Sequence, residues 1–472
     1  MLYNAQPLIT GAPFLTANDF TQLPLKPELL KNLDSLGFHQ MTPIQALSLP
    51  AVLAGKDVIG QGKTGSGKTA AFGLGVLNRL DVAFWRVQSL VLCPTRELAD
   101  QVTKSLRTLA RTQHNVKILT LCGGMPFGPQ VGSLEHGAHI IVGTPGRVEE
   151  HLRKGTLDLS HLSLLVLDEA DRMLDMGFQP SLDAILEQVP AKRQTLLFSA
   201  TYPDHIEKLA NRVMRQPVMA RVAETETAPR IEQSFYWVAD AENRLKALKT
   251  LLYAHLPESA IVFCRTRENT FEVAEALSKA GFSAVALNGD LEQRERDQVL
   301  VCFANRSISI LVATDVAARG IDIEALDLVV NYQMALDTEV HLHRIGRTGR
   351  ADQQGKAFTL FSDGERHRLA DLEAYLDTHL EEQSLPEVTP GAIPQPAMVT
   401  LQLDAGRKQK IRPGDILGAL TGEGGIDGQD VGKIALYDQT AFVAVKRTLA
   451  KKALSKLSQG KIKGRSVRVR RV

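Results

Sequence analysis

Cysteine is scarce in this 472-residue sequence, and the few cysteines stand far apart. They show no C-x-x-C spacing, which excludes the common zinc-binding motifs and a disulfide framework. We therefore expect reduced, mostly buried thiols. The four residues are Cys93, Cys122, Cys264 and Cys302.

Long hydrophobic runs are absent as well. No stretch of 18 or more apolar residues occurs, which argues against a membrane-spanning helix. Residues 1–6 lack a basic segment followed by an apolar core, so they do not indicate a secretory signal. A hydrophobic content of 44% and a charged content of 23% are typical of a soluble globular chain. Together these features predict a cytoplasmic enzyme with no membrane association.

The sequence also has little net charge, +2, but the charge is unevenly distributed. After Asp438 there are 11 Lys and Arg residues and no Asp or Glu, which leaves 44 of the 55 basic residues against all 53 acidic ones in the rest of the chain. A basic module on an acidic body points to nucleic acid as a partner.

The most informative stretch that is present is a glycine-rich run at 62–69, GKTGSGKT, between a short apolar segment and a helical pattern. This order of strand, glycine loop and helix fits the G-x-x-x-x-G-K-[ST] pattern, in which backbone N–H groups and the helix N-terminus hold a phosphate chain. The lysine would reach the β- and γ-phosphates, and the final hydroxyl would bind Mg²⁺. A flexible glycine turn is the alternative, but spacing, lysine, hydroxyl and flanking elements all favour phosphate binding. The predicted phosphate-binding residues are Gly62, Thr64, Gly65, Ser66, Gly67, Lys68 and Thr69.

Continuous apolar runs alternate with helical patterns on both sides of a polar segment at 223–230. Strands that are apolar on both faces predict parallel sheets covered by helices. The expected strands are 89–93, 118–121, 140–142, 164–167 and 195–198 before the segment, and 260–263, 283–287, 308–313, 326–331 and 357–361 after it. Residues 385–396 are proline-rich and read as a second linker.

The remainder of the chain predicts a smaller α+β module in the order βαββαβ, the split βαβ arrangement of RRM-like domains. Its expected elements are strand 398–403, helix 413–420, strands 432–436 and 441–445, helix 448–457 and strand 466–469. The predicted domains are therefore an extension (1–17), a first α/β domain (18–222), a linker (223–230), a second α/β domain (231–384), a linker (385–396) and the RRM-like domain (397–472).

A second chemical motif follows the apolar run 164–167, where the sequence reads Asp168-Glu169-Ala170-Asp171. A carboxylate at the end of a buried strand beside a phosphate loop is placed for Mg²⁺, usually through water. Asp168 is the predicted metal residue, and Glu169 would orient and deprotonate the attacking water. An acidic helix start on the surface is the alternative, and the upstream phosphate loop argues against it.

A third cluster, 343–350, reads HRIGRTGR and lies in the second α/β half. A solvated basic helix start is the simple interpretation. The alternative is that Arg347 and Arg350 act as arginine fingers, because guanidinium groups stabilise the charge that phosphoryl transfer spreads over the γ-oxygens. Such fingers would act only when the two halves close.

These motifs together resemble the DEAD-box family of ATP-dependent RNA helicases, and the resemblance extends from Phe20 to Val472. The family implies two tandem RecA-like domains that close on ATP and RNA, with ATP and Mg²⁺ as cofactors. The residues that carry the resemblance are Phe20 with 37–45, then 62–69, 94–98, 123–124, 144–147, 168–171, 199–201, 262–265, Gln293 with Arg296, 313–322 and 343–350.

The resemblance also implies roles for individual residues. Gln45 would read the adenine edge, Phe20 would stack on the adenine ring and Asp322 would contact the ribose. Coupling of ATP to RNA would involve Asp171, Ser199, Thr201, Arg319 and His343. The RNA backbone would be held by Thr95, Arg96, Gly124, Thr144, Gly146, Arg147, Arg265 and Thr314. One departure is Gly62, where the family usually has alanine, and we expect ATP binding to survive it with a slightly more flexible loop.

The basic tail resembles that of one bacterial branch of the family, on residues 410–422, 432–434 and 460–465. Proteins of that branch use an RRM-like tail to recognise a 23S ribosomal RNA hairpin near the peptidyl-transferase centre, in large-subunit precursor particles. This tail has few strand aromatics, Phe442 and Tyr437, so recognition would depend on basic residues. We expect Lys461, Lys463, Arg465, Arg468 and Arg470 to bind RNA. A nonspecific basic anchor is the alternative, since charge alone gives sequence-blind affinity.

The predicted protein is thus a monomeric ATP-dependent RNA helicase that remodels ribosomal RNA. A tandem-domain DNA helicase is a second interpretation, and it requires ATP turnover stimulated by DNA. A ribosomal-RNA-binding assembly chaperone with vestigial ATPase motifs is a third. The intact Lys68, Glu169, Arg347 and Arg350 argue against the third interpretation.

Overall fold

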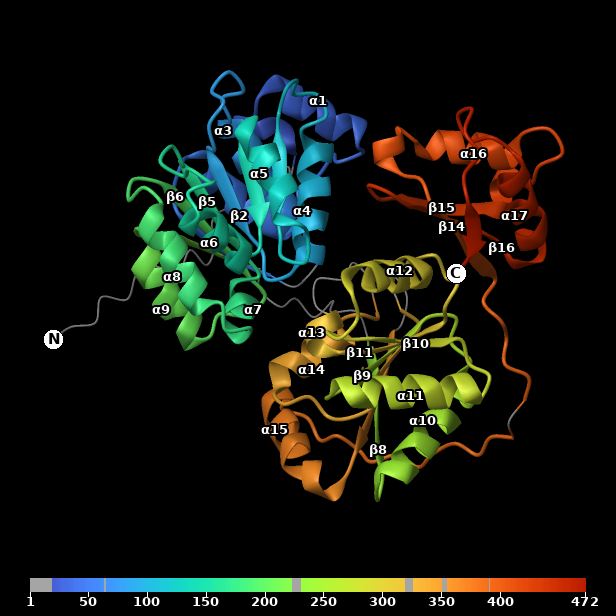
Figure 1. Ribbon diagram of the computed structural model, residues 1–472. Coiled ribbons are helices and arrows are strands. Elements are labelled where there is room, and N and C mark those ends of the chain that lie inside the picture. Colours follow the sequence, from blue (N-terminus) through green and yellow to red (C-terminus); the bar gives the residue numbers. More distant parts are fainter. Residues whose placement is uncertain (1–18, 63–64, 223–230, 319–325, 350–354, 390) are drawn as a thin grey trace. The chain divides into compact units, whose positions relative to one another are not determined.

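A computed structural model of the protein describes residues 19–62, 65–222, 231–318, 326–349, 355–389 and 391–472 (Figure 1). The chain divides into two compact units, Met1–Thr225 and Glu226–Val472. The predicted extension and the predicted linker 223–230 lie outside the described residues, and the predicted domain ranges stay predictions. The first unit holds one sheet, and the second unit holds two.

The sheet of the first unit has seven parallel strands in the order β3-β4-β2-β5-β6-β1-β7. Side chains of β5 alternate between two cores, with Leu164 and Val166 on one face and Leu165 and Leu167 on the other. Both faces are therefore covered by helices, which explains the continuous apolar sequence. The strands are β1 (Val58–Gln61), β2 (Ser89–Leu92), β3 (Ile118–Leu121), β4 (Ile140–Gly143), β5 (Leu164–Asp168), β6 (Gln194–Ser199) and β7 (Val218–Arg221).

The helices of this unit divide between the two faces. One core joins side chains of α1 (Pro27–Ser35), α2 (Pro43–Leu53), α3 (Lys68–Arg79) and α4 (Arg96–Leu109). The other joins side chains of α6 (Pro145–Arg153), α7 (Ala170–Asp175), α8 (Gln179–Gln188) and α9 (Asp204–Val213). The short α5 (Phe127–Glu135) has no fully buried residue.

The larger sheet of the second unit has six parallel strands in the order β10-β11-β9-β12-β13-β8. Its strands are β8 (Ile231–Trp237), β9 (Ala260–Cys264), β10 (Ala284–Leu287), β11 (Ile310–Thr314), β12 (Leu328–Asn331) and β13 (Gly355–Phe361). Its helices are α10 (Ala241–His255), α11 (Arg267–Lys279), α12 (Gln293–Ala304), α13 (Asp315–Ala318), α14 (Thr338–Ile345) and α15 (Arg366–Leu376).

The C-terminal part forms a four-stranded antiparallel sheet in the order β15-β16-β14-β17, with two helices. Its elements are β14 (Met398–Leu403), α16 (Pro413–Thr421), β15 (Val431–Leu436), β16 (Ala441–Lys446), α17 (Ala450–Gln459) and β17 (Val469–Arg471). The predicted βαββαβ order is confirmed. The last strand was predicted too early, at 466–469.

The predicted fold class, two parallel α/β sheets followed by a small α+β domain, is confirmed. The sequence interpretation missed the edge strands β7 and β8. All four cysteines are free and buried, as expected. No helix of the described residues is long and apolar enough to cross a membrane.

Candidate functional site

Most of the predicted site residues of the first unit follow the carboxyl ends of its parallel strands, which meet at one edge of the sheet. The phosphate loop follows β1, Asp168 ends β5 and Ser199 ends β6. Thr95, Gly124 and Thr144 follow β2, β3 and β4, which form the other half of the sheet. The strand order thus separates the residues predicted for ATP from those predicted for RNA.

The glycine loop is held against the start of α2. Gly67 has a left-handed backbone (φ +94°), and Gln45 Nε2 donates a hydrogen bond to its carbonyl oxygen (3.1 Å). A Cβ at Gly67 would lie 2.5 Å from Gln45 Nε2, so only glycine fits there. Gln45 Oε1 in turn accepts a hydrogen bond from Thr42 N (2.9 Å). The side chain expected to read adenine is therefore fixed by the loop itself.

Lys68 begins α3 and is buried. Its Nζ donates a hydrogen bond to the Gly62 carbonyl (2.6 Å), and Gly62 N donates to the Ser199 carbonyl (3.1 Å). The Ser66 hydroxyl is buried with no hydrogen-bond partner among the described residues. A cation and a free hydroxyl inside a glycine loop suit a phosphate chain. Gly65 and Thr69 flank the same loop, and Thr64 lies outside the described residues.

Asp168 is buried at the end of β5, where Glu169 N donates a hydrogen bond to its Oδ1 (3.0 Å). Burial, reinforced by the charge of Glu169, raises the pKa of Asp168 to about 7, while Lys68 opposes this rise. Because burial and the charge of Glu169 disfavour the ionised form of Asp168, a bound cation would stabilise that form. Among the described residues no three His, Cys, Asp or Glu side chains gather into a metal site.

The backbone of Glu169 adopts a left-handed conformation. Its φ of +50° is unusual for a residue with a side chain, and such strain is often found at functional positions. Its buried Oε2 has no hydrogen-bond partner among the described residues, although Arg172 Nε lies 3.6 Å away. This geometry leaves one carboxylate oxygen available to accept a proton from a water molecule.

Asp171 connects the acidic motif to the loop after β6. Its Oδ2 accepts hydrogen bonds from Thr201 N (3.1 Å) and from Thr201 Oγ1 (3.0 Å). Ser199 is buried beside the phosphate loop through its contact with Gly62. Two of the residues predicted to couple ATP to RNA, Ser199 and Thr201, therefore contact the glycine loop and the acidic motif respectively.

Phe20 lies in a short 3-10 helix and packs into the core, with only 3% of its surface exposed. An adenine ring would meet only the small exposed part of this side chain. Stacking of Phe20 on adenine stays a prediction.

At the other half of this sheet edge, Arg147 joins the segments that follow β3 and β4. Its Nη1 donates to the Met125 carbonyl (2.9 Å) and to Gln130 Oε1 (3.0 Å), and its Nε lies 3.0 Å from Glu150 Oε2. These contacts fix the loop after β3 against the start of α6.

The remaining residues predicted for RNA in this unit lie nearby along the same edge. The Thr95 hydroxyl caps α4 by accepting from Leu98 N (3.2 Å), and Arg96 begins that helix. Gly124 has a left-handed backbone (φ +72°), Thr144 stands at the N-cap position of α6 without a side-chain capping hydrogen bond, and Gly146 has open space beside it.

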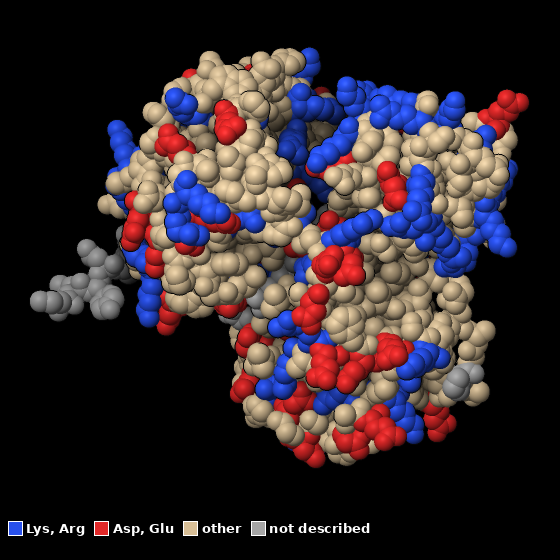
Figure 2. Space-filling view, in the orientation of Figure 1, with Lys and Arg blue, Asp and Glu red and all other residues tan. Residues whose placement is uncertain are grey.

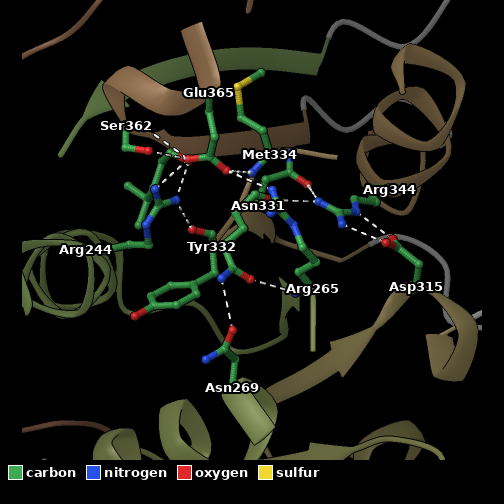
Figure 3. Close-up of polar contacts among 12 residues, drawn as sticks. Arg244, Arg265, Asn269, Asp315, Asn331, Tyr332, Met334, Arg344, Ser362 and Glu365 are labelled. Atoms are coloured by element: carbon green, nitrogen blue, oxygen red, sulfur yellow. Dashed lines mark hydrogen bonds and ion pairs between the residues drawn. The ribbon is translucent and has the colours of Figure 1, made fainter. Parts of the chain in front are cut away.

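In the second unit, Arg265 and Thr314 lie at the ends of β9 and β11, neighbouring strands of the sheet. Figure 3 shows Arg265 beside Glu365, whose Oε1 lies 3.4 Å from Arg265 Nη2. Glu365 Oε2 also accepts a hydrogen bond from the buried Arg244 Nη2 (2.6 Å), and Met334 N donates to Oε1 (3.2 Å). Hydrogen bonds from Arg244 and Ser362 help hold the pKa of Glu365 below its usual value despite burial, which raises it.

A second ion pair in Figure 3 joins Arg344 of α14 to Asp315, next to Thr314. Arg344 Nε and Nη2 donate to the two Asp315 oxygens (2.6 and 2.7 Å), and Nη1 donates to Asn331 Oδ1 (3.0 Å). Bidentate pairs of this kind fix orientation as well as charge. None of these four residues has an individual role in the predicted site. Asp315 and Arg344 lie within the predicted motifs 313–322 and 343–350, whereas Arg244 and Glu365 lie outside every predicted motif.

The predicted arginine finger Arg347 is buried within its own domain, and His343 is half-buried on α14. The structure does not describe Arg350, Arg319 or Asp322. Their predicted roles stay predictions.

The C-terminal domain, residues 397–472, carries 16 Lys and Arg against 6 Asp and Glu. Figure 2 shows basic side chains gathered on this domain. Lys463 Nζ donates a hydrogen bond to the Lys410 carbonyl (2.8 Å), and Ile462 and Arg465 form a short bridge. The predicted RNA residues Lys461, Lys463 and Arg465 therefore lie beside a second basic loop, 407–412. Arg470 pairs with Gln402 at the sheet edge.

Comparisons with known proteins agree with this geometry. Residues 42–209 match the DEAD/DEAH box helicase model, residues 243–352 match the helicase conserved C-terminal domain, and residues 400–471 match the DbpA RNA binding domain.

Similar proteins include the ATP-dependent RNA helicase DbpA of Escherichia coli, 53% identical over 94% of this chain and 97% of that protein. The DEAD-box ATP-dependent RNA helicase CshA of Geobacillus kaustophilus is 45% identical over 78% of both chains. Among solved structures, S. cerevisiae Dbp5 bound to RNA and ADP BeF3 is 30% identical with a TM-score of 0.70, covering 78% of this chain and 96% of that one.

Proposed function

We propose that this chain, which belongs to the DEAD-box family of ATP-dependent RNA helicases and is of the DbpA type, remodels 23S ribosomal RNA during assembly of the large ribosomal subunit. ATP use and RNA binding follow from the family. The ribosomal RNA target, the Mg²⁺ ion and the residue roles are our proposals. The single observation that carries the catalytic part is the strained, buried Glu169 beside Asp168 and the glycine loop.

The proposed chemistry uses the residues of the first unit in sequence. Gln45 orients the adenine, and the backbone of the glycine loop with Lys68 holds the phosphates. Asp168 and Thr69 would hold Mg²⁺, which neutralises charge on the phosphate oxygens when bound. Glu169 Oε2 accepts the proton of the attacking water. Motif order leads us to propose that Arg347 and Arg350 stabilise the transferred phosphoryl group.

RNA would be held by the loops that follow β2, β3 and β4 in the first unit and by Arg265 and Thr314 in the second. Contacts of this kind, from backbone N–H groups, hydroxyls and arginines to phosphate oxygens, give affinity without reading sequence. The Asp171–Thr201 hydrogen bonds would transmit the state of the ATP site to this RNA surface.

Sequence preference would come from the C-terminal domain. Its likeness to the DbpA RNA binding domain supports a hairpin of 23S ribosomal RNA near the peptidyl-transferase centre as the target. The two basic loops, 407–412 and 460–465, supply the charge. We further propose that the protein works as a monomer in the cytoplasm on precursors of the large subunit.

Replacing Glu169 with Gln tests the catalytic proposal. The amide keeps the shape of the side chain but cannot accept the proton, so we expect RNA-stimulated ATP hydrolysis to fall by about 10²–10⁴-fold while ATP binding survives. Glu187→Gln, an exposed carboxylate on α8, is the matched control. Unchanged hydrolysis in Glu169→Gln would reject the proposal.

The same preparations separate the other interpretations. A DNA helicase would show ATP turnover stimulated by DNA as well as RNA. A chaperone with vestigial ATPase motifs would unwind equally well without ATP.

A further inference from the structure

Gln333 follows β12 in the second helicase domain and belongs to none of the predicted motifs. β12 lies between β9 and β13 in the sheet, and Tyr332 N donates a hydrogen bond to the Phe263 carbonyl of β9 (3.0 Å). The two parallel strands therefore end side by side. Gln333 lies where β12 ends, next to the end of β9 that is followed by Arg265.

The side-chain amide of Gln333 binds two residues of the turn between β9 and α11. Its Oε1 accepts a hydrogen bond from Arg265 N (2.7 Å), and its Nε2 donates to Asn269 Oδ1 (3.0 Å). Asn269 N in turn donates to Thr266 Oγ1 (3.1 Å), the N-cap of α11. An amide can donate and accept at once, so one side chain fixes both the start of this turn and the first turn of the helix.

The backbone of Gln333 is anchored to α14. Its carbonyl accepts a hydrogen bond from Arg344 Nη1 (2.8 Å). The same guanidinium is bound at two points to Asp315, which directly follows Thr314 at the end of β11 (Figure 3). Because a bidentate pair fixes orientation, it gives Gln333 a rigid support. Gln333 and this pair thus tie Arg265 to Thr314, the two residues of this domain that are predicted to hold RNA.

The side chain of Arg265 is held less firmly than its backbone. It is 40% exposed, and its Nη2 lies 3.4 Å from Glu365 Oε1, which is long for a hydrogen bond. The Glu365 carboxylate already accepts hydrogen bonds from Arg244 and Ser362. A guanidinium has five donors, so this single long contact leaves donors for a phosphate. The place of the Arg265 guanidinium therefore depends on the backbone that Gln333 holds.

We propose that Gln333 is a positioning residue for RNA binding by the second helicase domain. It sets the place of Arg265 relative to Thr314, and so the spacing of two contacts to the RNA backbone. Without the amide, the Arg265 guanidinium is still present but must be ordered when RNA binds, which costs affinity. The inference rests on the proposed function, in which Arg265 and Thr314 hold the RNA.

Gln333→Met tests the proposal in the full-length protein. Methionine keeps the length of the side chain and removes both amide hydrogen bonds, while the carbonyl that Arg344 binds is retained. We expect the RNA concentration for half-maximal stimulation of ATP hydrolysis to rise by about fivefold. The maximal rate at saturating RNA should change far less. The matched control is Gln383→Met, the same substitution at an exposed glutamine of this domain, and it should leave the half-maximal concentration unchanged.

A double-mutant cycle separates positioning from a general disturbance of the domain. Arg265→Ala removes the guanidinium, so adding Gln333→Met to it should raise the half-maximal RNA concentration no further. Additive effects of the two substitutions would overturn the inference. An unchanged concentration in Gln333→Met, with a raised one in Arg265→Ala, would overturn the inference alone. An unchanged concentration in Arg265→Ala would overturn it together with the proposed role of Arg265, so the two failures are distinguishable.

Discussion

Replacing Asp168 with Asn should stabilise the ligand-free protein, and more so at high pH. The raised pKa means that the native state holds a proton that the unfolded chain has already lost, so stability falls as pH rises from about 4 to about 7. A pKa raised from 3.8 to about 7 corresponds to about 4 kcal/mol at pH 8. At pH 5 the same calculation gives about 1–2 kcal/mol.

The quantity to measure is the difference between the stabilisation by Asp168→Asn at pH 8 and the stabilisation at pH 5. Asn Oδ1 can keep the hydrogen bond from Glu169 N, and the cost of its new amide group does not depend on pH. The stabilisation by Asp168→Asn should therefore grow by about 2–3 kcal/mol between pH 5 and pH 8.

Tryptophan fluorescence can follow this change in the first unit. The chain has two tryptophans, and a Trp237→Phe background leaves Trp85, which lies in the first unit, as the only one. Urea unfolding at pH 5 and pH 8 gives the two free energies, and Glu187→Gln should show no such pH-dependent gain. A gain that is equal at both pH values, or larger at pH 5, would refute the reasoning.

Three further substitutions test the site. Gly67→Ala places a Cβ 2.5 Å from Gln45 Nε2 in a left-handed backbone, so nucleotide affinity measured by fluorescence titration should fall by about tenfold or more. In the control Gly62→Ala the Cβ would lie 3.1 Å from the movable Ser66 hydroxyl, so the affinity should stay close to that of the unmodified protein. Similar losses of affinity in both variants would contradict this account. Thr201→Val removes a hydroxyl from the Asp171 carboxylate, at a cost of about 1–3 kcal/mol, so duplex unwinding should fall more than ATP hydrolysis, and a parallel fall would argue against a coupling role. Glu365→Gln removes the charge that faces Arg265, so RNA affinity should fall by about tenfold with ATP affinity unchanged, and unaltered RNA binding would show that the contact has no such role.

Much of the fold could be predicted because the strands are short apolar runs buried on both faces. The strands β7 and β8 escaped because both lie at sheet edges, where polar residues are tolerated, and β7 ends in an exposed arginine. The strand β17 was placed three residues early because Val and Arg alternate over residues 467–470, and this pattern fits more than one register.

The chemistry of the glycine loop could be predicted because its residues are contiguous. The Glu365 contacts could not, since Arg244 and Glu365 are 121 positions apart and meet only in the folded domain. The same holds for Thr400 and Asn305, 95 positions apart. The sequence carries no signal that distinguishes a buried threonine on a strand from a threonine on an exposed sheet face.

Selective stimulation by RNA tests the central claim most directly. ATP hydrolysis by the full-length protein is measured against increasing concentrations of the 23S ribosomal RNA hairpin, and separately of a hairpin with the same composition but scrambled sequence. We predict half-maximal stimulation by the 23S hairpin at a concentration lower by about tenfold or more, and loss of this preference in Lys461→Glu with Lys463→Glu. Equal stimulation by the two hairpins would contradict the account.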